Sequence, residues 1–364
     1  GSLLDFLIVD MFAINNLYMV SLQQFLELFD VSIERSDKAP LAAKRIVNIA
    51  DFLTFHVTCY MQRGVFERHK RIWVLMLAMK IEQIAGRLSG AYVASLLKAG
   101  GALDPETQRA KPHAWLPDSV WLNGPALAPP VQPLHALPES IAGAMSGEQW
   151  RAWYDHDAPE TQRIPEFDER LNAFEKLLTV RALREDRMLL SAQDYMVATL
   201  GAPYVESRPL NLPSVVDEAT ALVPIVALLS QGADPTNLID TLAKKRKRQV
   251  LTISLGQGQE PAARKLLQTG VATGDWVLLQ NCHLGLGFMA ELEQWLSKLE
   301  TEPVETFRLF ITAEPHAHFP IGLLQMSIKV TNAAPAGIKA GLKGSYAWIS
   351  QDMLDSNSQP QWRS

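Results

Sequence analysis

Four short apolar runs, separated by segments with helical spacing, most strongly limit what the second half of this chain can form. Each run is rich in aliphatic residues and is bounded by Gly, Asp, Pro or Asn; the runs are Val223–Ser230, Val250–Leu255, Trp276–Gln280 and Phe307–Thr312. Runs without polar alternation suit strands that are buried on both faces, as in a parallel sheet. Because a fifth run, Ser327–Asn332, follows, the pattern predicts an α/β core with five strands.

The residues before this core predict helices. The first stretch, from Leu3 to Val20, is nearly all apolar, which raises the question of a membrane span. Asp5 and Asp10 interrupt it, and no basic flank precedes it as a signal peptide would require. We therefore expect a buried helix that continues through Phe29, and no membrane partner.

Further helices are expected on both sides of a proline-rich stretch. The first two cover Lys38–Gln62 and Phe66–Lys98, the latter with a break near Gly86 or Gly90. Eight prolines between Leu103 and Ser140 predict an irregular loop, because proline fixes its own backbone and biases the preceding residue away from helix. The predicted parts of the chain are a helical segment at 1–102, a Pro-rich loop at 103–145, a helical lead-in at 146–213, a large α/β subdomain at 214–345 and the start of a following helix or tail at 346–364.

Composition excludes some classes of function. The net charge of −5 argues against a general nucleic-acid-binding surface, so we expect no nucleic-acid partner. Two cysteines cannot build a disulfide framework, which fits a reducing compartment. The basic run Lys244–Arg248 ends a predicted helix, where cations suit the negative end of the dipole, so we interpret it as a solvated helix end.

The loop after the first strand is where a phosphate-binding loop would lie. Such a loop needs Gly-x-x-x-x-Gly-Lys-Ser/Thr, with backbone amides around the phosphates, a lysine that reaches them and a hydroxyl on magnesium. Counted from Gly232, the second glycine, the lysine and the hydroxyl are replaced by Asn237, Leu238 and Ile239. The favoured interpretation is a tight turn in which Asp234 or Thr236 caps the next helix.

The loops after the next two strands also lack the expected chemistry. Gly256 and Gly258 imitate a dinucleotide fingerprint, but Pro261 stands at its third glycine and suits the first turn of a helix. The third strand ends in Gln280 and Asn281, where a hydrolytic P-loop enzyme would carry an acidic pair for magnesium and water activation.

A zinc site is the remaining candidate near these strand ends. Its ligands would be Cys282, His283, His316 and His318. Cys282 and His283 are neighbours, and on an extended chain they point to opposite faces, so one metal is hard to share. We therefore predict no catalytic, cofactor-binding or metal-binding residue in this chain.

Longer motifs, taken in order, resemble the dynein heavy chain family. They are Arg63–Lys70, Leu229–Thr236, Ile253–Glu260, Trp276–Leu284 and Phe319–Gln325. The α/β part is similar to the sixth AAA+ module of that motor, and the helices before it resemble the segment between the fifth and sixth modules. Gly337–Lys343 and Gln351–Asp355 are most similar to axonemal outer-arm chains, whereas Gln231 and Ala333-Ala334 depart from the family pattern.

The resemblance implies a degenerate AAA+ P-loop-type parallel five-stranded sheet with flanking helices, preceded by an all-helical segment. It implies a structural, nucleotide-free module of an ATP-driven, minus-end-directed microtubule motor, with ATP and Mg bound in other modules of the parent. The implied partners are the neighbouring AAA+ modules, dynein intermediate and light chains, and microtubules, in the cytoskeleton of a ciliary or flagellar axoneme. The alternatives are an active P-loop NTPase or nucleotide sensor and, on Gly256 and Gly258, a dinucleotide-dependent enzyme.

Overall fold

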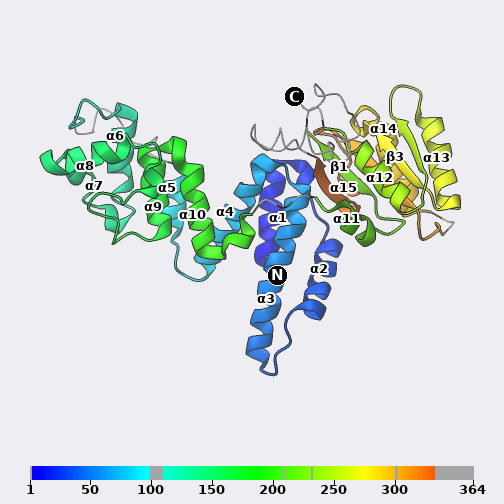
Figure 1. Cartoon of the computed structure of the whole chain (residues 1–364), viewed down its shortest axis with the longest axis horizontal. Coiled ribbons are helices and arrows are strands. Elements are labelled where there is room, and N and C mark those ends of the chain that lie inside the picture. Colours follow the sequence, from blue (N-terminus) through cyan, green and yellow to red (C-terminus); the bar gives the residue numbers. More distant parts are fainter. Residues whose placement is uncertain are drawn as a thin grey trace, which may run out of the picture. The chain divides into compact units, whose positions relative to one another are not determined.

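The computed structural model describes residues 2–98, 110–206, 208, 210–230, 233–299 and 302–332 of the chain. These residues form two compact units (Figure 1). The described residues within 1–7 and 71–208 belong to one, called here the helical unit, and the described residues within 8–70 and 209–364 to the other, called the sheet unit. Residues 8–70 thus group with the sheet, whereas residues 2–7 and 71–98 group with the later helices, and the division at 102 stays a prediction. The tail predicted for 346–364 lies outside the described residues.

The sheet has five parallel strands, as predicted. Their order across the sheet is β2-β3-β4-β1-β5, and every neighbouring pair is parallel. The strands are β1 Ile225–Leu229, β2 Val250–Ser254, β3 Trp276–Gln280, β4 Arg308–Ala313 and β5 Ile328–Asn332. The helices around them are α11 Leu212–Glu218, α12 Thr236–Lys245, α13 Glu260–Thr273, α14 Leu286–Ser297 and α15 Ile321–Met326, with the 3₁₀ turn η7 Cys282–Leu284. This is the parallel five-stranded sheet with flanking helices that the resemblance to an AAA+ P-loop-type module implied.

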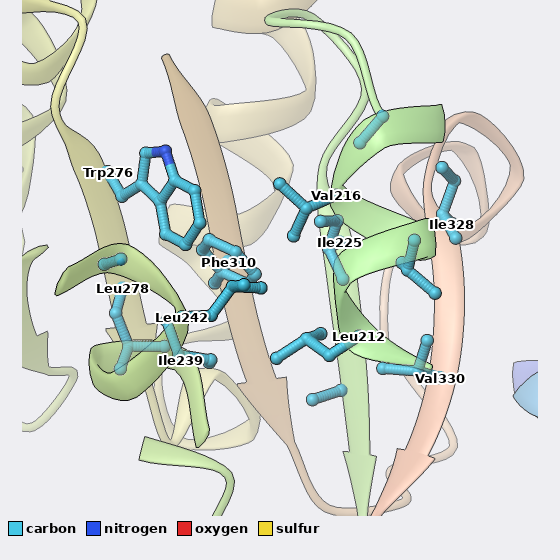
Figure 2. Packing of buried hydrophobic residues seen from close by; sticks show 14 of the residues in the cluster. Leu212, Val216, Ile225, Ile239, Leu242, Trp276, Leu278, Phe310, Ile328 and Val330 are labelled. Carbon is cyan, nitrogen blue, oxygen red and sulfur yellow. The ribbon is translucent and has the colours of Figure 1, made fainter. Parts of the chain in front are cut away.

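One apolar core holds α11 and α12 against the sheet (Figure 2). The rings of Trp276 on β3 and Phe310 on β4 lie 5.2 Å apart and are tilted by 45°. The alternate positions Ile328 and Val330 bring β5 into the same core. Strands β1, β3 and β4 are buried almost throughout, which fits aliphatic runs without polar alternation, whereas the edge strand β2 is only partly buried.

The helix predicted from Leu3 to Phe29 is wrong as one element. The observed elements are α1 Ser2–Ile14, the 3₁₀ turn η1 Asn16–Tyr18, α2 Leu22–Arg35 and α3 Ala42–Gly64. The Asn15 side chain accepts a hydrogen bond from the Leu17 N–H, and Ser21 accepts one from the Gln24 N–H. Short polar side chains satisfy the first free amides of a helix, so these two residues end one helix and start the next.

In the helical unit the break predicted near Gly86 is confirmed. Helix α4 Glu67–Ile84 starts in the sheet unit and continues into the helical unit, and α5 Gly90–Lys98 follows. Gly86 between them has φ +72°, a conformation that glycine adopts without a Cβ penalty. The later elements are α8 Ala144–Tyr154, η4 Pro159–Thr161, α9 Ala173–Leu183, η5 Glu185–Arg187, α10 Met188–Leu200 and η6 Ala202–Tyr204.

The irregular loop predicted over 103–145 is wrong for its described part. It contains α6 Asp118–Leu127, the 3₁₀ turn η3 Gln132–Leu134 and α7 Leu137–Ala142. Pro117 lies at the N-cap of α6 and Pro138 in the first turn of α7, where the missing amide proton is not needed. Several prolines therefore start helices here. Within the described ranges, none of the helices combines the length and hydropathy that crossing a bilayer requires.

Candidate functional site

The carboxyl ends of the parallel strands lie at one edge of the sheet, where α/β proteins place their ligands. Three sequence-predicted positions meet there: Thr236 at the first residue of α12, and Gln280 and Asn281 at the end of β3. The hydrogen bonds among these residues and their neighbours decide what this edge can bind.

The described part of the loop between β1 and α12 is a turn. Asp234 Oδ1 accepts hydrogen bonds from the Thr236 backbone N–H at 2.9 Å and from the Thr236 hydroxyl at 2.5 Å. Asp234, which precedes the N-cap residue Pro235, is therefore the acceptor at this helix start. Gln231 and Gly232, where a phosphate-binding loop would begin, lie outside the described residues.

Asn237, Leu238 and Ile239 stand where a phosphate-binding loop has its second glycine, its lysine and its hydroxyl. Leu238, at the lysine position, is 57% exposed, and Asn237 beside it is also exposed. Ile239, at the hydroxyl position, is 1% exposed and packs into the core cluster with α11 and the sheet. This first turn of α12 therefore offers an apolar surface and a core anchor in place of a cation and a metal-binding hydroxyl.

A neutral hydrogen-bond network links the strand ends. Gln280 Nε2 donates to Thr236 Oγ1 at 2.7 Å, and Asn281 Nδ2 donates to Ser254 Oγ at 2.8 Å. The Asn281 backbone N–H also donates to Thr312 Oγ1 at 3.1 Å. Asn281 has φ +55°, a left-handed conformation that Asn tolerates better than most residues. Amides and hydroxyls thus satisfy one another across β2, β3, β4 and α12.

Ser254 and Thr312 were not among the predicted site residues. The sequence does place each of them at the end of a predicted strand, next to the turn that follows. That position was the available signal, but their partnership with Asn281 depends on β3 lying between β2 and β4.

Three of the four candidate zinc ligands have hydrogen-bond partners, and the ring of the fourth, His318, lies 5.8 Å from the ring of His316. Cys282 is fully buried, its Sγ donates to the Leu279 carbonyl oxygen at 3.3 Å, and burial raises the pKa of its thiol. His283 Nδ1 accepts from the Glu314 N–H at 3.2 Å, and His316 Nδ1 accepts from the His318 N–H at 3.1 Å. In the described part of the chain, no three His, Cys, Asp or Glu side chains are placed to hold a metal.

The glycine-rich loop and the basic run lie as the spacing indicated. Pro261 is in the first turn of α13, and Gly258 has φ +78°. Lys244 and Lys245 form the exposed last turn of α12, and Arg246 after them pairs with Asp217 at 2.8 Å. The predicted solvated helix end is therefore confirmed.

Comparisons with known proteins identify relatives of this arrangement. Residues 220–331 match the family described as dynein heavy chain region D6 P-loop domain. The whole chain is 48% identical over 364 residues to the dynein gamma chain of the flagellar outer arm from Chlamydomonas reinhardtii. It is 44% identical over 368 residues to human dynein axonemal heavy chain 8, again over 100% of this chain. In both cases the chain spans 8% of the relative's length.

Proposed function

This chain belongs to the dynein heavy chain family, with residues 220–331 as its region D6 P-loop domain, and we propose that its sheet unit is a structural AAA+ module that binds no nucleotide. The proposal concerns this region alone. It separates the fold, which is that of a nucleotide-binding domain, from the chemistry at its strand ends.

The hydrogen bond between Gln280 and Thr236 carries the proposal. In P-loop NTPases, a hydroxyl at the start of the helix and an acidic residue at the end of a strand hold Mg²⁺ between them. Here the hydroxyl position is taken by Ile239, and the residue at the strand end is the neutral amide Gln280. That amide donates at 2.7 Å to Thr236, three residues before the hydroxyl position. Mg²⁺ prefers charged oxygen ligands and dehydrates reluctantly, so its affinity for this neutral pair is expected to be low.

The first turn of α12 supports the same conclusion. A bound triphosphate carries several negative charges, which the family of P-loop enzymes neutralises with a lysine and a metal. Leu238 at the lysine position supplies neither charge nor hydrogen-bond donor, and Ile239 is committed to the core. Phosphoryl transfer depends almost wholly on positioning and electrostatic stabilisation, so loss of both groups leaves little catalysis.

At the level of the whole protein, we propose a subunit of a microtubule motor in the axoneme of a cilium or flagellum. The relatives are named for the flagellar outer arm and the axoneme, which supports this location. ATP and Mg²⁺ then act in other modules of the parent. Its partners are neighbouring AAA+ modules of the same heavy chain, intermediate and light chains, and microtubules.

A phosphate-release assay on the 364-residue chain with ATP and Mg²⁺ tests the structural role. The proposal predicts a rate equal to that of buffer with a heat-inactivated sample. Hydrolysis that saturates with ATP and disappears in Thr236→Ala would instead support the alternative, an active P-loop NTPase, because Thr236 is the one hydroxyl that the first turn of α12 presents at this edge.

A further inference from the structure

Strand β5 presents two chemically different faces. Ile328 and Val330 belong to the apolar core, whereas the alternate residues Lys329 and Thr331 point to the opposite face, because successive side chains of a strand alternate. Thr331 Oγ1 lies 3.3 Å from the Arg63 carbonyl oxygen and 3.2 Å from that of Val65, at the end of α3. Its hydroxyl therefore donates to carbonyls that the helix itself leaves free.

The end of α3 packs closely on β5. A Cβ atom on Gly64 would lie 3.1 Å from Lys329 Cβ and 3.2 Å from the Lys329 carbonyl oxygen, so only glycine fits without a shift. From α2, Gln24 Nε2 donates to the Ser327 carbonyl oxygen at 3.0 Å. We call this contact, between residues 63–65 and residues 327–331, the α3–β5 junction.

An amine is buried inside the α3–β5 junction. Lys329 is 4% exposed, and its Nζ donates to the carbonyl oxygens of Leu324 at 2.6 Å and Ser327 at 3.0 Å. Among the described residues, no carboxylate pairs with it. A buried ammonium that lacks a counterion costs several kcal/mol, so burial favours the neutral amine.

The charged and titratable groups around the junction come mostly from α3. Arg63 forms an ion pair with Glu218 of α11 at 2.5 Å and lies 4.3 Å from the Tyr60 ring centre. Burial, and next the positive charge of Arg63, lower the pKa of Lys329 to about 7. Burial raises the pKa of Tyr60 to about 12, and burial lowers the pKa of His56.

Other elements near the junction carry further groups: Tyr18 of η1 and His69 of α4 are hydrogen-bonded to each other, and Glu27 and Arg35 lie on α2. Burial lowers the pKa of His69, whose Nδ1 lies 2.7 Å from the Tyr18 hydroxyl oxygen, and burial raises the pKa of Tyr18 to about 12. Helix α15 and strand β1 carry no charged residue. Between pH 6.5 and 8.5, Lys329 is thus the member of this group expected to change its charge.

We propose that Lys329 makes the α3–β5 junction proton-sensitive: the neutral amine keeps the end of α3 packed on the strand, and the ammonium opens it to water. The physical reason is the cost of holding a second positive charge beside Arg63 with only two carbonyl acceptors. Opening hydrates the ammonium and also breaks the Thr331 cap, so protonation is coupled to the contact between helix and sheet. The device is independent of nucleotide and of the proposed structural role.

Hydrogen exchange on the whole chain tests the proposal. The protection factors of the amides at residues 63–66, corrected for intrinsic exchange at each pH, should rise from pH 6.5 to 8.5. The amine binds its proton more weakly in the closed junction than in water, so closure is favoured as pH rises. Linkage of one proton with pKa values of about 7 and 10.5 gives an increase of roughly twentyfold at full exposure.

Two variants separate the amine from the rest of the junction. Lys329→Met keeps the length of the side chain and cannot titrate, so its protection factors should stay constant over this range. Thr331→Val loses the hydroxyl cap and should show lower protection with the same dependence on pH as the parent. Constant protection in the parent, or an equal rise in Lys329→Met, would overturn the proposal.

A second measurement needs no substitution. The ε-¹³C signal of Lys329, assigned by through-bond correlation in the parent chain, reports the protonation of the amine directly. A titration midpoint that lies between the closed-state value of about 7 and the ordinary value of about 10.4 supports the proposal, because opening on protonation couples the two states. A midpoint at the ordinary value overturns it even if Lys329→Met does not fold.

Discussion

Gln280 at the end of β3 donates a hydrogen bond of 2.7 Å to the hydroxyl of Thr236 at the start of α12. The bond joins the two elements between which a P-loop enzyme holds magnesium. Both members of the pair are neutral, and the Thr236 hydroxyl in turn donates to the Asp234 carboxylate at 2.5 Å. The sheet therefore keeps the strand order and helix positions of its fold, while the side chains at its strand ends hydrogen-bond to neighbouring elements of the same unit.

Gly270 of α13 sets how closely this helix approaches β3. A Cβ at Gly270 would lie 2.6 Å from Val277 Cγ2 and 3.0 Å from the Phe307 ring. We expect Gly270→Val to lower the free energy of unfolding by about 2 to 3 kcal/mol, since overpacking outweighs any gain in helix propensity. Gly256→Val is the matched control, because no atom lies within 4 Å of its Cβ position. Equal urea midpoints for the two variants would contradict the packing described.

The basic run after α12 should matter little for folding. Lys244, Lys245 and Arg246 are exposed, and the pair of Arg246 with Asp217 is on the surface. Replacement of all three with Ala should change stability by about 1 kcal/mol or less, because exposed ion pairs contribute little. Thermal unfolding followed by circular dichroism measures this. A fall in Tm above roughly 10 °C would mean that the run has a structural partner.

The ion pair of Glu160 with Arg187 should make the stability of the helical unit depend on pH in the acidic range. The hydrogen bond from Arg187, at 2.5 Å, lowers the pKa of the Glu160 carboxyl below its ordinary value of 4.5. A carboxyl whose pKa is lower in the folded state stabilises the fold above its unfolded pKa, and this stabilisation is lost as pH falls. Glu160→Gln should therefore be less stable than the parent at pH 7, and the difference should shrink between pH 5 and 3.

Urea unfolding at pH 7, 5 and 3 measures this difference. The control is Glu148→Gln, an exposed carboxyl on α8 of the same unit, which should track the parent at every pH. A difference between Glu160→Gln and the parent that stays constant from pH 7 to 3 would show that the ion pair does not titrate with folding.

The inner strands β1, β3 and β4 were predictable from sequence because strands buried on both faces require continuous apolar residues. Trp276–Gln280 was predicted with the bounds that β3 has, and the other four runs contain or overlap their strands. Helix ends were predicted less well. Asn15 and Ser21 interrupt an apolar stretch whose overall hydropathy favours one helix, and only the cap hydrogen bonds show where it stops.

At the site, the sequence could show which groups are missing but not which groups meet. Leu238, Ile239 and Gln280 were recognised because a known chemistry requires other residues at their positions. The contacts of Gln280 with Thr236 and of Asn281 with Ser254 join residues 44 and 27 positions apart. They follow from the order of the strands, which no single run of residues encodes.

Isothermal titration calorimetry with ATP and Mg²⁺ measures whether this module binds nucleotide. The parent chain should give only heats of dilution. Leu238→Lys should give the same result, because one restored cation leaves Asn237, Ile239 and Gln280 in place of the remaining phosphate and metal groups. Saturable binding to one site of the parent chain at micromolar ATP would contradict the account.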